Sequence, residues 1–246
     1  MLAHRIIPTM LCRGRSLVKG KRFNSWRNVG HAMQATRIYQ SRGVDELVLL
    51  DINATRDGRE PDYQMVSELS EKCFMPLSVG GGVTCLAHVR ELLRSGADKV
   101  VMNTAVIEQP ALLTEITDAL GCQAVVVSID YRDGIVYTHS GQHSTGRTVR
   151  EVVLQMQEAG AGEIMLTSIE REGMLCGYDD RMLREIAPLL SIPLIAHGGA
   201  GHYAHMHTAF LAGADAVAAG AMFQFEDATP AGAARYLNGQ GIDVRI

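Results

Sequence analysis

Asp45-Glu46-Leu47-Val48-Leu49-Leu50 and Gly162-Glu163-Ile164-Met165-Leu166-Thr167 decide the fold of this chain, because they are copies of one segment 117 positions apart. The same shift superposes two further pairs: Gly81-Gly82 on Gly198-Gly199, and Gly96-Ala97-Asp98 on Gly213-Ala214-Asp215. A period this long exceeds that of the units that build solenoids. It indicates half of a domain that has been duplicated and fused.

Each half contains about four strand-then-helix units, which predicts an α/β protein with a parallel sheet. Short, continuous β-branched runs, typical of buried parallel strands, occur at residues 5–10, 46–51, 76–80, 99–103, 123–129, 163–167, 193–197 and 215–219. Amphipathic helical stretches lie near 31–43, 61–73, 84–95, 109–120, 147–159, 180–190, 202–212 and 229–238. We therefore predict one (β/α)8 TIM barrel over residues 1–246, built from half-barrels of about 1–120 and 121–246.

The composition is that of an ordinary globular domain, with 47% hydrophobic and 20% charged residues. No apolar run approaches the roughly 20 residues of a membrane span. The first residues, Met1-Leu2-Ala3-His4-Arg5, lack an apolar signal segment, so we expect a cytoplasmic protein. The five cysteines form no C-x-x-C pair, which favours reduced thiols. We expect neither a cofactor nor a bound metal.

Charge is distributed unevenly along the chain. Residues 1–44 contain nine Lys or Arg and no Asp or Glu, although the whole chain has a net charge of −4. A basic cluster follows the first predicted strand: Arg13, Arg15, Lys19, Lys21, Arg22 and Arg27. We interpret it as a lid over an anionic small molecule, with solvated loop charges as the alternative. Nucleic acid is disfavoured, because the rest of the chain is acidic and aromatic residues are few.

Reactive residues of this fold sit at the carboxyl ends of the strands. The positions to consider are Leu11–Cys12, Asp51–Asn53, Gly80–Gly82, Asn103–Thr104, Asp130, Thr167–Ser168, His197–Gly199 and Gly220–Ala221. Glycines there let backbone N–H groups approach an anion. Because the duplication repeats the glycine-rich loops, we predict two phosphate sites and a ligand with a phosphate at each end. Glycines needed only for tight turns are the alternative.

Asp130 ends the fifth strand between the two predicted phosphate sites, where a carboxylate can act as a general acid or base. The alternative is an Asp that only caps the following turn. Asp51, Asn53, Thr167 and Ser168 could supply hydrogen bonds to the same region. The first strand, by contrast, ends at Leu11 without an acid.

At the opposite end of the barrel, four charged residues stand at strand starts: Arg5, Glu46, Lys99 and Glu163. Two positive and two negative side chains pointing inward could form a salt-bridged ring that plugs the barrel or gates a small molecule. Scattered exposed strand ends are the alternative.

Two other patterns suggest chemistry more weakly. His202, His205 and His207 have metal-like spacing, but no carboxylate or cysteine joins them. Cys12 could be a nucleophile if the neighbouring arginines lowered its pKa, although no activating base is identifiable.

Motifs in the same order along nearly the whole chain resemble one family, the cyclase subunit (HisF type) of imidazole glycerol phosphate synthase, a lyase of histidine biosynthesis. The matching stretches include Met1-Leu2-Ala3-His4-Arg5-Ile6-Ile7, Val18-Lys19-Gly20, Leu50-Asp51-Ile52, Val79-Gly80-Gly81-Gly82, Asn103-Thr104-Ala105, Gln123-Ala124-Val125-Val126-Val127 and Gly198-Gly199-Ala200-Gly201. The resemblance implies a glutamine amidotransferase (glutaminase) partner that docks at the barrel bottom, near Asp98, and supplies ammonia.

The resemblance also implies roles for individual residues. Asp130 is the implied catalytic residue, and the ring Arg5, Glu46, Lys99 and Glu163 is the implied ammonia gate. Substrate and phosphate binding fall to Lys19, Gly82, Asn103, Thr104, Thr167, Gly173, Gly199, Gly220 and Ala221. In the family, ammonia attacks a bisphosphate intermediate, which yields imidazole glycerol phosphate and an aminoimidazole ribotide.

The chain departs from the family where the family's other catalytic Asp should stand, because Leu11 occupies that position. Glu172 replaces a usual Asp, and His31-Ala32 replaces a usual Asp-Pro. Our leading hypothesis is therefore a paralogue that uses ammonia on another phosphorylated, activated or nucleotide-linked sugar, as in O-antigen (lipopolysaccharide) sugar amidination. A genuine histidine-pathway cyclase and a non-catalytic ammonia conduit are the alternatives.

Overall fold

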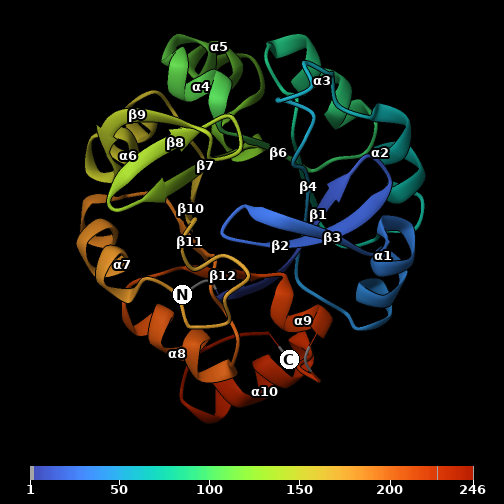
Figure 1. Ribbon diagram of the computed structural model, residues 1–246, viewed down its shortest axis with the longest axis vertical. Helices are drawn as coiled ribbons and strands as arrows, with labels where there is room; N and C mark the ends of the chain where they lie inside the picture. The colour runs from blue at the N-terminus through green and yellow to red at the C-terminus, as the bar shows by residue number, and fades with distance from the viewer. Residues whose placement is uncertain (1–2, 226, 246) are drawn as a thin grey trace.

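The computed structural model describes residues 3–225 and 227–245. Eight parallel strands close into a barrel: β1 (Arg5–Arg13), β4 (Leu47–Asp51), β5 (Leu77–Gly80), β6 (Lys99–Met102), β7 (Val125–Arg132), β10 (Glu163–Ser168), β11 (Leu194–His197) and β12 (Ala216–Ala219). Each strand pairs with the next in this order, and β12 pairs with β1 to complete the ring. Figure 1 looks along the barrel, with the helices arranged around it. The predicted eight-stranded barrel is thus confirmed.

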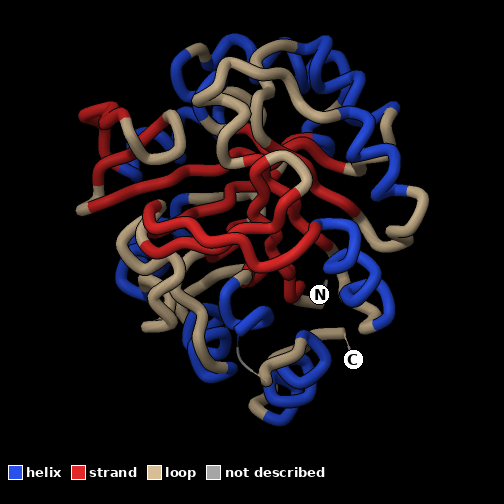
Figure 2. The backbone as a smooth tube through the Cα atoms, turned by 45° about the vertical axis from the view of Figure 1, so that its right-hand side comes forward, coloured by secondary structure: helices blue, strands red, loops and turns tan. Residues whose placement is uncertain are grey.

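Helices cover the outside of the barrel, as Figure 2 shows by colour. The long ones are α1 (Ala32–Ser41), α2 (Tyr63–Ser70), α3 (Leu86–Arg94), α5 (Pro110–Leu120), α6 (Val149–Glu158), α7 (Asp180–Ile186), α8 (Tyr203–Leu211) and α10 (Pro230–Gly239). Two short helices, α4 (Thr104–Glu108) and α9 (Ala221–Phe225), follow the fourth strand of each half. Asp62 and Asp179 cap α2 and α7 by accepting from Met65 N and Met182 N, which satisfies free N–H groups of each first turn.

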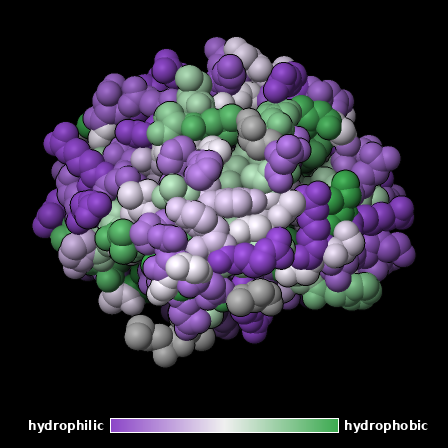
Figure 3. Space-filling model, turned by 90° about the horizontal axis from the view of Figure 1, so that it is seen from below, coloured by the Kyte–Doolittle hydropathy of each residue, from purple (hydrophilic) through white to green (hydrophobic). Residues whose placement is uncertain are grey.

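Two layers of apolar residues hold this arrangement. Inside the barrel, Ile7, Val48, Val101, Val126, Met165 and Ile195 pack with small alanines of β12. A larger cluster fills the space between strands and helices. Figure 3 shows one side of the molecule, where a mostly hydrophilic surface is broken by small apolar groups. No helix in the described part of the chain has the length and apolar character needed to cross a membrane.

Four strands were not predicted from the sequence. They are β2 (Ser16–Lys21), β3 (Asn24–His31), β8 (Ile135–Thr138) and β9 (His143–Thr148), which form one antiparallel hairpin after the first strand of each half. The residues of β3 and β9 are mostly polar and exposed, so they lack the apolar run that identifies a buried strand. The β2–β3 hairpin crosses the barrel mouth in Figure 1 and carries four residues of the basic cluster that we interpreted as a lid: Lys19, Lys21, Arg22 and Arg27.

Candidate active site

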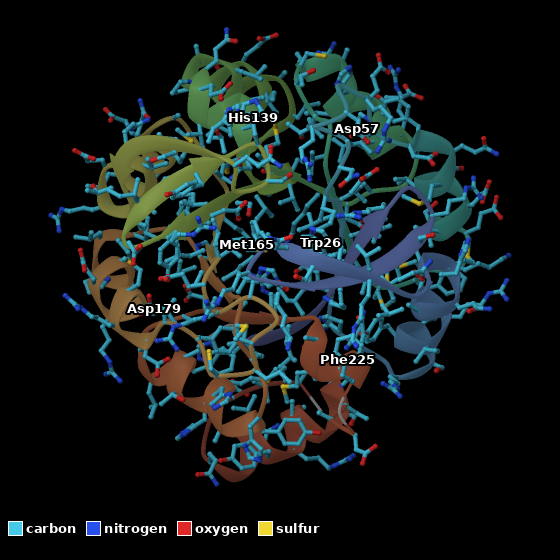
Figure 4. The ribbon with its side chains drawn as sticks, in the orientation of Figure 1. Trp26, Asp57, His139, Met165, Asp179 and Phe225 are labelled. Carbon is cyan, nitrogen blue, oxygen red and sulfur yellow. The ribbon has the colours of Figure 1, made fainter. Side chains whose placement is uncertain are left out.

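A cavity of about 420 Å³ opens at the carboxyl ends of the strands. Strand ends from both halves line it: Leu11, Leu50, Asp51, Gly82, Asn103, Thr104, Ser128, Asp130, Thr167 and His197. Phe23 and Trp26 of the β2–β3 hairpin and His139 and Ser140 of the β8–β9 hairpin complete the lining. Figure 4 shows Trp26 near the middle of the barrel and His139 on the upper rim. The cavity lies where this fold places its active sites.

Asp130 is held in this cavity by two neighbours. Ser128 Oγ donates to Asp130 Oδ1 at 3.1 Å, and Asn103 Nδ2 lies 3.5 Å from Asp130 Oδ2. Burial is the largest influence on the carboxyl group, and together with the negative charge of Glu172 it outweighs the hydrogen bonds and raises the pKa of Asp130 to about 6. A carboxyl group with this pKa can exchange a proton near neutral pH, which is what general acid–base chemistry requires.

The predicted first-half phosphate residues meet in the same cavity. Asn103 Nδ2 donates to Ser128 O at 2.9 Å, and Thr104 Oγ1 donates to Asn103 Oδ1 at 3.1 Å while accepting from His139 N at 3.0 Å. Gly82 has a φ of 74°, and its N–H donates to Thr55 Oγ1 at 3.3 Å. A side chain at Gly82 would collide with the backbone of Arg59, so only glycine fits there.

The predicted second-half phosphate residues do not line this cavity. Gly173, Gly199, Gly220 and Ala221 lie outside its lining. The β2–β3 hairpin covers part of this group, because a side chain at Gly173 would meet Gly20 O and one at Gly220 would meet Lys19 Nζ. Arg22 N also donates to Glu172 O at 2.9 Å, which fastens the hairpin to this side. The two predicted sites are therefore unequal: the first opens into the cavity, whereas Gly173 and Gly220 of the second lie against the β2–β3 hairpin.

Lys19 and Glu172 are buried under the hairpin. The side chain of Lys19 is 1% exposed, and Nζ lies 3.5 Å from Thr9 O. Burial lowers the pKa of Lys19, and the negative charge of Glu172 only partly opposes this. Burial likewise raises the pKa of Glu172, whose Oε2 has no hydrogen-bond partner. Both shifts favour the uncharged forms.

Sequence reasoning assigned no role to His197, which the structure places in the cavity. It ends β11 and lies 3.1 Å through Nδ1 from Thr167 Oγ1. Burial, reinforced by the nearby Lys19, lowers the pKa of His197 to about 3, so the imidazole is neutral. Its place at a strand end, directly before the repeated Gly198-Gly199, was the available signal.

Leu11 occupies the place in the first half that Asp130 occupies in the second. In the barrel register Leu11 pairs with Leu50, whereas Asp130 pairs with Thr167, and Leu50 and Thr167 are equivalent in the repeat. Leu11 is 3% exposed and contributes an apolar wall. Of the other predicted hydrogen-bonding residues, Asp51 lines the cavity, but its Oδ1 accepts from Asn53 N and Ala54 N. Asn53 and Ser168 do not line it.

The predicted charged ring is closed at the opposite end of the barrel. Arg5 reaches Glu46 and Glu163 at 2.7 Å each. Lys99 Nζ lies 2.7 Å from Glu163 and 3.3 Å from Glu46. Burial alone would raise the pKa of Glu163, but Arg5 and Lys99 outweigh it and lower the pKa. The four side chains thus bridge strands from opposite sides of the barrel, and the alternative of scattered exposed ends is excluded.

Asp98, the residue implied in partner docking, has a local structural partner. Its Oδ2 accepts from Leu77 N at 2.8 Å. Asp215 makes the same contact with Leu194 N at 2.8 Å in the second half. The contact therefore belongs to the repeat.

Cys12 and the histidines near α8 make local structural contacts. Cys12 is buried and its Sγ lies 3.5 Å from Leu50 O. Burial raises the pKa of the thiol, so the condition for a nucleophilic Cys12, a lowered pKa, is not met. His202 caps α8 through a hydrogen bond from Ala204 N, and His205 Nδ1 accepts from Gly201 N. Among the described residues, no group of three or more His, Cys, Asp or Glu is placed to hold a metal ion.

Comparison with known proteins identifies the class that this fold and cavity define. The model of the histidine biosynthesis protein family matches residues 5–229. The chain belongs to this family.

Curated relatives narrow the class further. The chain is 43% identical over 251 residues to the imidazole glycerol phosphate synthase subunit HisF of Chlorobium phaeobacteroides (strain BS1), with all of both chains covered. It is 42% identical to the subunit of the same name from Thermotoga sp. (strain RQ2), covering all of this chain and 99% of the other. The HisF subunit of Dictyoglomus thermophilum is 41% identical over both full lengths. The chain is thus a HisF-type cyclase subunit by family.

Proposed function

We propose that this chain is the synthase subunit of an imidazole glycerol phosphate synthase in histidine biosynthesis, which uses ammonia from a glutaminase partner. The observation that carries the proposal is Asp130, partly buried beside Asn103 in the mouth cavity and with a pKa raised to about 6. Full-length relatives named for this reaction support the choice of substrate over the sugar-amidination hypothesis. None of their names supports a role in surface-polysaccharide synthesis.

Ammonia would enter through the Arg5–Glu46–Lys99–Glu163 ring and reach the cavity along the barrel axis. The ring has no net formal charge, because two cations face two anions. In the cavity, Gly82, Asn103 and Thr104 would hold one phosphate of the substrate. Asp130 would then transfer protons as ammonia attacks and the product ring closes. Lys19 and the second-half glycines would hold the other phosphate once the hairpin makes room.

A cyclase assay tests this proposal directly. The purified chain receives the histidine-pathway bisphosphate intermediate with saturating ammonium salt, which bypasses the partner. We expect turnover whose pH profile has a transition near pH 6, in line with the raised pKa of Asp130. Absence of turnover in a folded protein that still binds the bisphosphate would refute the histidine-pathway assignment.

Leu11 favours a second candidate, in which the same scaffold uses ammonia on a different phosphorylated or activated substrate. The position equivalent to Asp130 carries no acid and is buried at 3% exposure. If the unsubstituted chain is inactive with the bisphosphate and the Leu11→Asp variant has cyclase activity, the chain has diverged to another substrate. If ammonia transfer in the complex survives Asp130→Asn unchanged, the chain is instead a conduit for a partner's chemistry.

A further inference from the structure

A second cavity, of about 450 Å³, lies beside the main one and is lined by four arginines. Arg13 comes from the end of β1, Arg22 from the tip of the β2–β3 hairpin, Arg56 from the loop after β4 and Arg132 from the end of β7. We call it the arginine pocket. Its lining includes no Asp or Glu. Phe23, Trp26 and Ser140 line both cavities, so the two are adjacent and one ligand can extend from one into the other.

Among the residues that the structure describes, no carboxylate pairs with the arginines of the arginine pocket. Within residues 3–225 and 227–245, none of its four arginines lies within 4.0 Å of a carboxylate oxygen. Neighbouring arginines outside the pocket are paired: Arg15 with Glu68, and Arg59 with Asp51 and Asp57. Four like charges that converge on one hollow repel one another unless an anion binds between them.

Neutral contacts orient these guanidinium groups. The Arg13 guanidinium lies 5.5 Å from the centre of the Trp26 ring, and that of Arg132 lies 5.2 Å from the Tyr137 ring. With its amide oxygen turned toward Arg56, Gln142 accepts from Nε at 3.0 Å and from Nη2 at 3.3 Å. Arg13 Nε is buried and has no hydrogen-bond partner. The pocket therefore holds positioned donors, one of which lacks an acceptor.

The backbone on both sides of the pocket is held in an uncommon conformation. Arg22 and Phe23 form the hairpin tip with φ of 53° and 59°, in a turn that usually carries Asn-Gly. Facing them, His139 and Ser140 have φ of 52° and 57°. The two turns are in close contact, because a side chain on Gly141 would lie 2.9 Å from Phe23. Non-glycine residues in this region cluster at ligand sites, where the strain serves to place side chains.

We propose that the arginine pocket binds a diphosphate group of a substrate of the second candidate kind, at a site distinct from the glycine-rich phosphate loops. Planar guanidinium groups recognise phosphate oxygens through paired hydrogen bonds. One phosphate monoester carries about −1.5 to −2 charges, so four arginines match a diphosphate better than a single phosphate. The proposal rests on the second candidate function, because both phosphates of the histidine-pathway bisphosphate are already assigned to the glycine-rich loops and Lys19. It narrows the substrate of that candidate function to one with an anionic group reaching toward the β2–β3 and β8–β9 hairpin tips.

Trp26 provides the test, because it is the only tryptophan of the chain and lines the pocket. The chain is titrated at constant ionic strength with inorganic pyrophosphate, a nucleoside diphosphate or orthophosphate, and Trp26 fluorescence is recorded. Calorimetry gives the same dissociation constants without relying on fluorescence. We expect pyrophosphate and the nucleoside diphosphate to bind about tenfold more tightly than orthophosphate, because each reaches more guanidinium groups. Tighter binding of the nucleoside diphosphate than of pyrophosphate would identify a nucleotide-linked substrate.

The matched variants are Arg22→Ala/Arg56→Ala in the pocket and Arg90→Ala/Arg150→Ala on the exposed outer helices, which remove the same charge. We expect the first to weaken pyrophosphate binding at least about tenfold and the second to leave it unchanged. Equal affinity in both variants, or pyrophosphate binding no tighter than orthophosphate, would overturn the proposal. Circular dichroism checks that all variants are folded.

The outcome is separable from that of the cyclase assay. Turnover without pyrophosphate binding removes this inference and leaves the proposed function. Pyrophosphate binding that depends on Arg22 and Arg56, without turnover of the bisphosphate, supports this inference and removes the histidine-pathway proposal.

Discussion

The two halves of the barrel are alike at its bottom and different at its mouth. At the bottom, Asp98 accepts from Leu77 N and Asp215 from Leu194 N, each at 2.8 Å. At the mouth, the first half presents Leu11 beside Leu50, whereas the second presents Asp130 beside Thr167. The duplicated contacts that hold strands in register have been kept in both copies. A carboxylate at this strand end is present in only one of them.

The difference extends to the neighbouring strand. Gly80 and His197 are equivalent in the repeat, and Gly80 packs against Leu50 while His197 contacts Thr167. At these two positions the first half is therefore apolar and the second polar, whereas Asp51, Asn103 and Thr104 add polar groups to the first half elsewhere in the cavity. Such a cavity can orient a substrate with one apolar face and several polar groups.

The largest expected effect concerns the polar side. Asp130→Asn should lower ammonia-dependent turnover by about 10²–10⁴, because it removes the group proposed to transfer protons. Leu11→Asn, at the equivalent position in the first half, should change turnover far less. Steady-state kinetics on both variants decide the matter, and similar losses would contradict a one-sided active site.

The next largest expected effect is a loss of stability when the Arg5–Glu46–Lys99–Glu163 ring is broken. Glu46→Ala should lower the free energy of unfolding by about 3 kcal/mol, because it leaves Arg5 and Lys99 partly unpaired in a buried setting. Urea unfolding followed by circular dichroism measures the change. Glu91→Ala, which removes an exposed partner of Arg94, is the control and should leave the midpoint unchanged. A Glu46 variant as stable as the control would show that the ring does not hold the strands together.

The pH dependence of stability tests the burial of Asp130. A carboxyl group whose pKa is raised on folding stabilises the protein below its ordinary pKa of 3.8, and this contribution is lost as pH rises through about 6. Asp130→Asn does not titrate. Relative to the parent it should therefore gain stability between pH 4 and 7, by up to about 3 kcal/mol for a shift of about two pKa units. Urea midpoints across this range measure the difference, and a gap that is constant with pH would argue against the raised pKa.

The smallest expected effect concerns Asp98 and Asp215, and it distinguishes a contribution to stability from a contribution to partner binding. Asp98→Ala and Asp215→Ala should each cost about 1.5 kcal/mol in urea unfolding, since each carboxylate accepts from one strand N–H. If Asp98 also contacts the glutaminase, only its variant should weaken that complex in calorimetry. Unequal stabilities would show that the halves differ at the bottom too.

The repeat and the buried strands were predictable because both depend on short-range patterns. Gly82, Asn103, Thr104 and Asp130 lie near or just beyond the carboxyl ends of β5, β6 and β7, so barrel geometry alone brings them together. The β2–β3 hairpin was missed because its strands pair outside the core and carry polar residues. The covering of Gly173 and Gly220 by that hairpin depends on contacts between segments about 150 residues or more apart. No local pattern encodes them.

Lys19 and Glu172 form a buried pair of titratable groups at the β2–β3 hairpin. Under the hairpin, both pKa shifts favour the uncharged forms. Exposure of this pair to water would return both pKa values toward their ordinary range, which favours proton uptake by Lys19 and proton release by Glu172, so the two proton changes would oppose each other. Movement of the hairpin away from this pair should then depend on the ionic strength of the medium more than on its pH. Added salt should therefore shift the balance between the state in which the pair is covered and the state in which it is exposed.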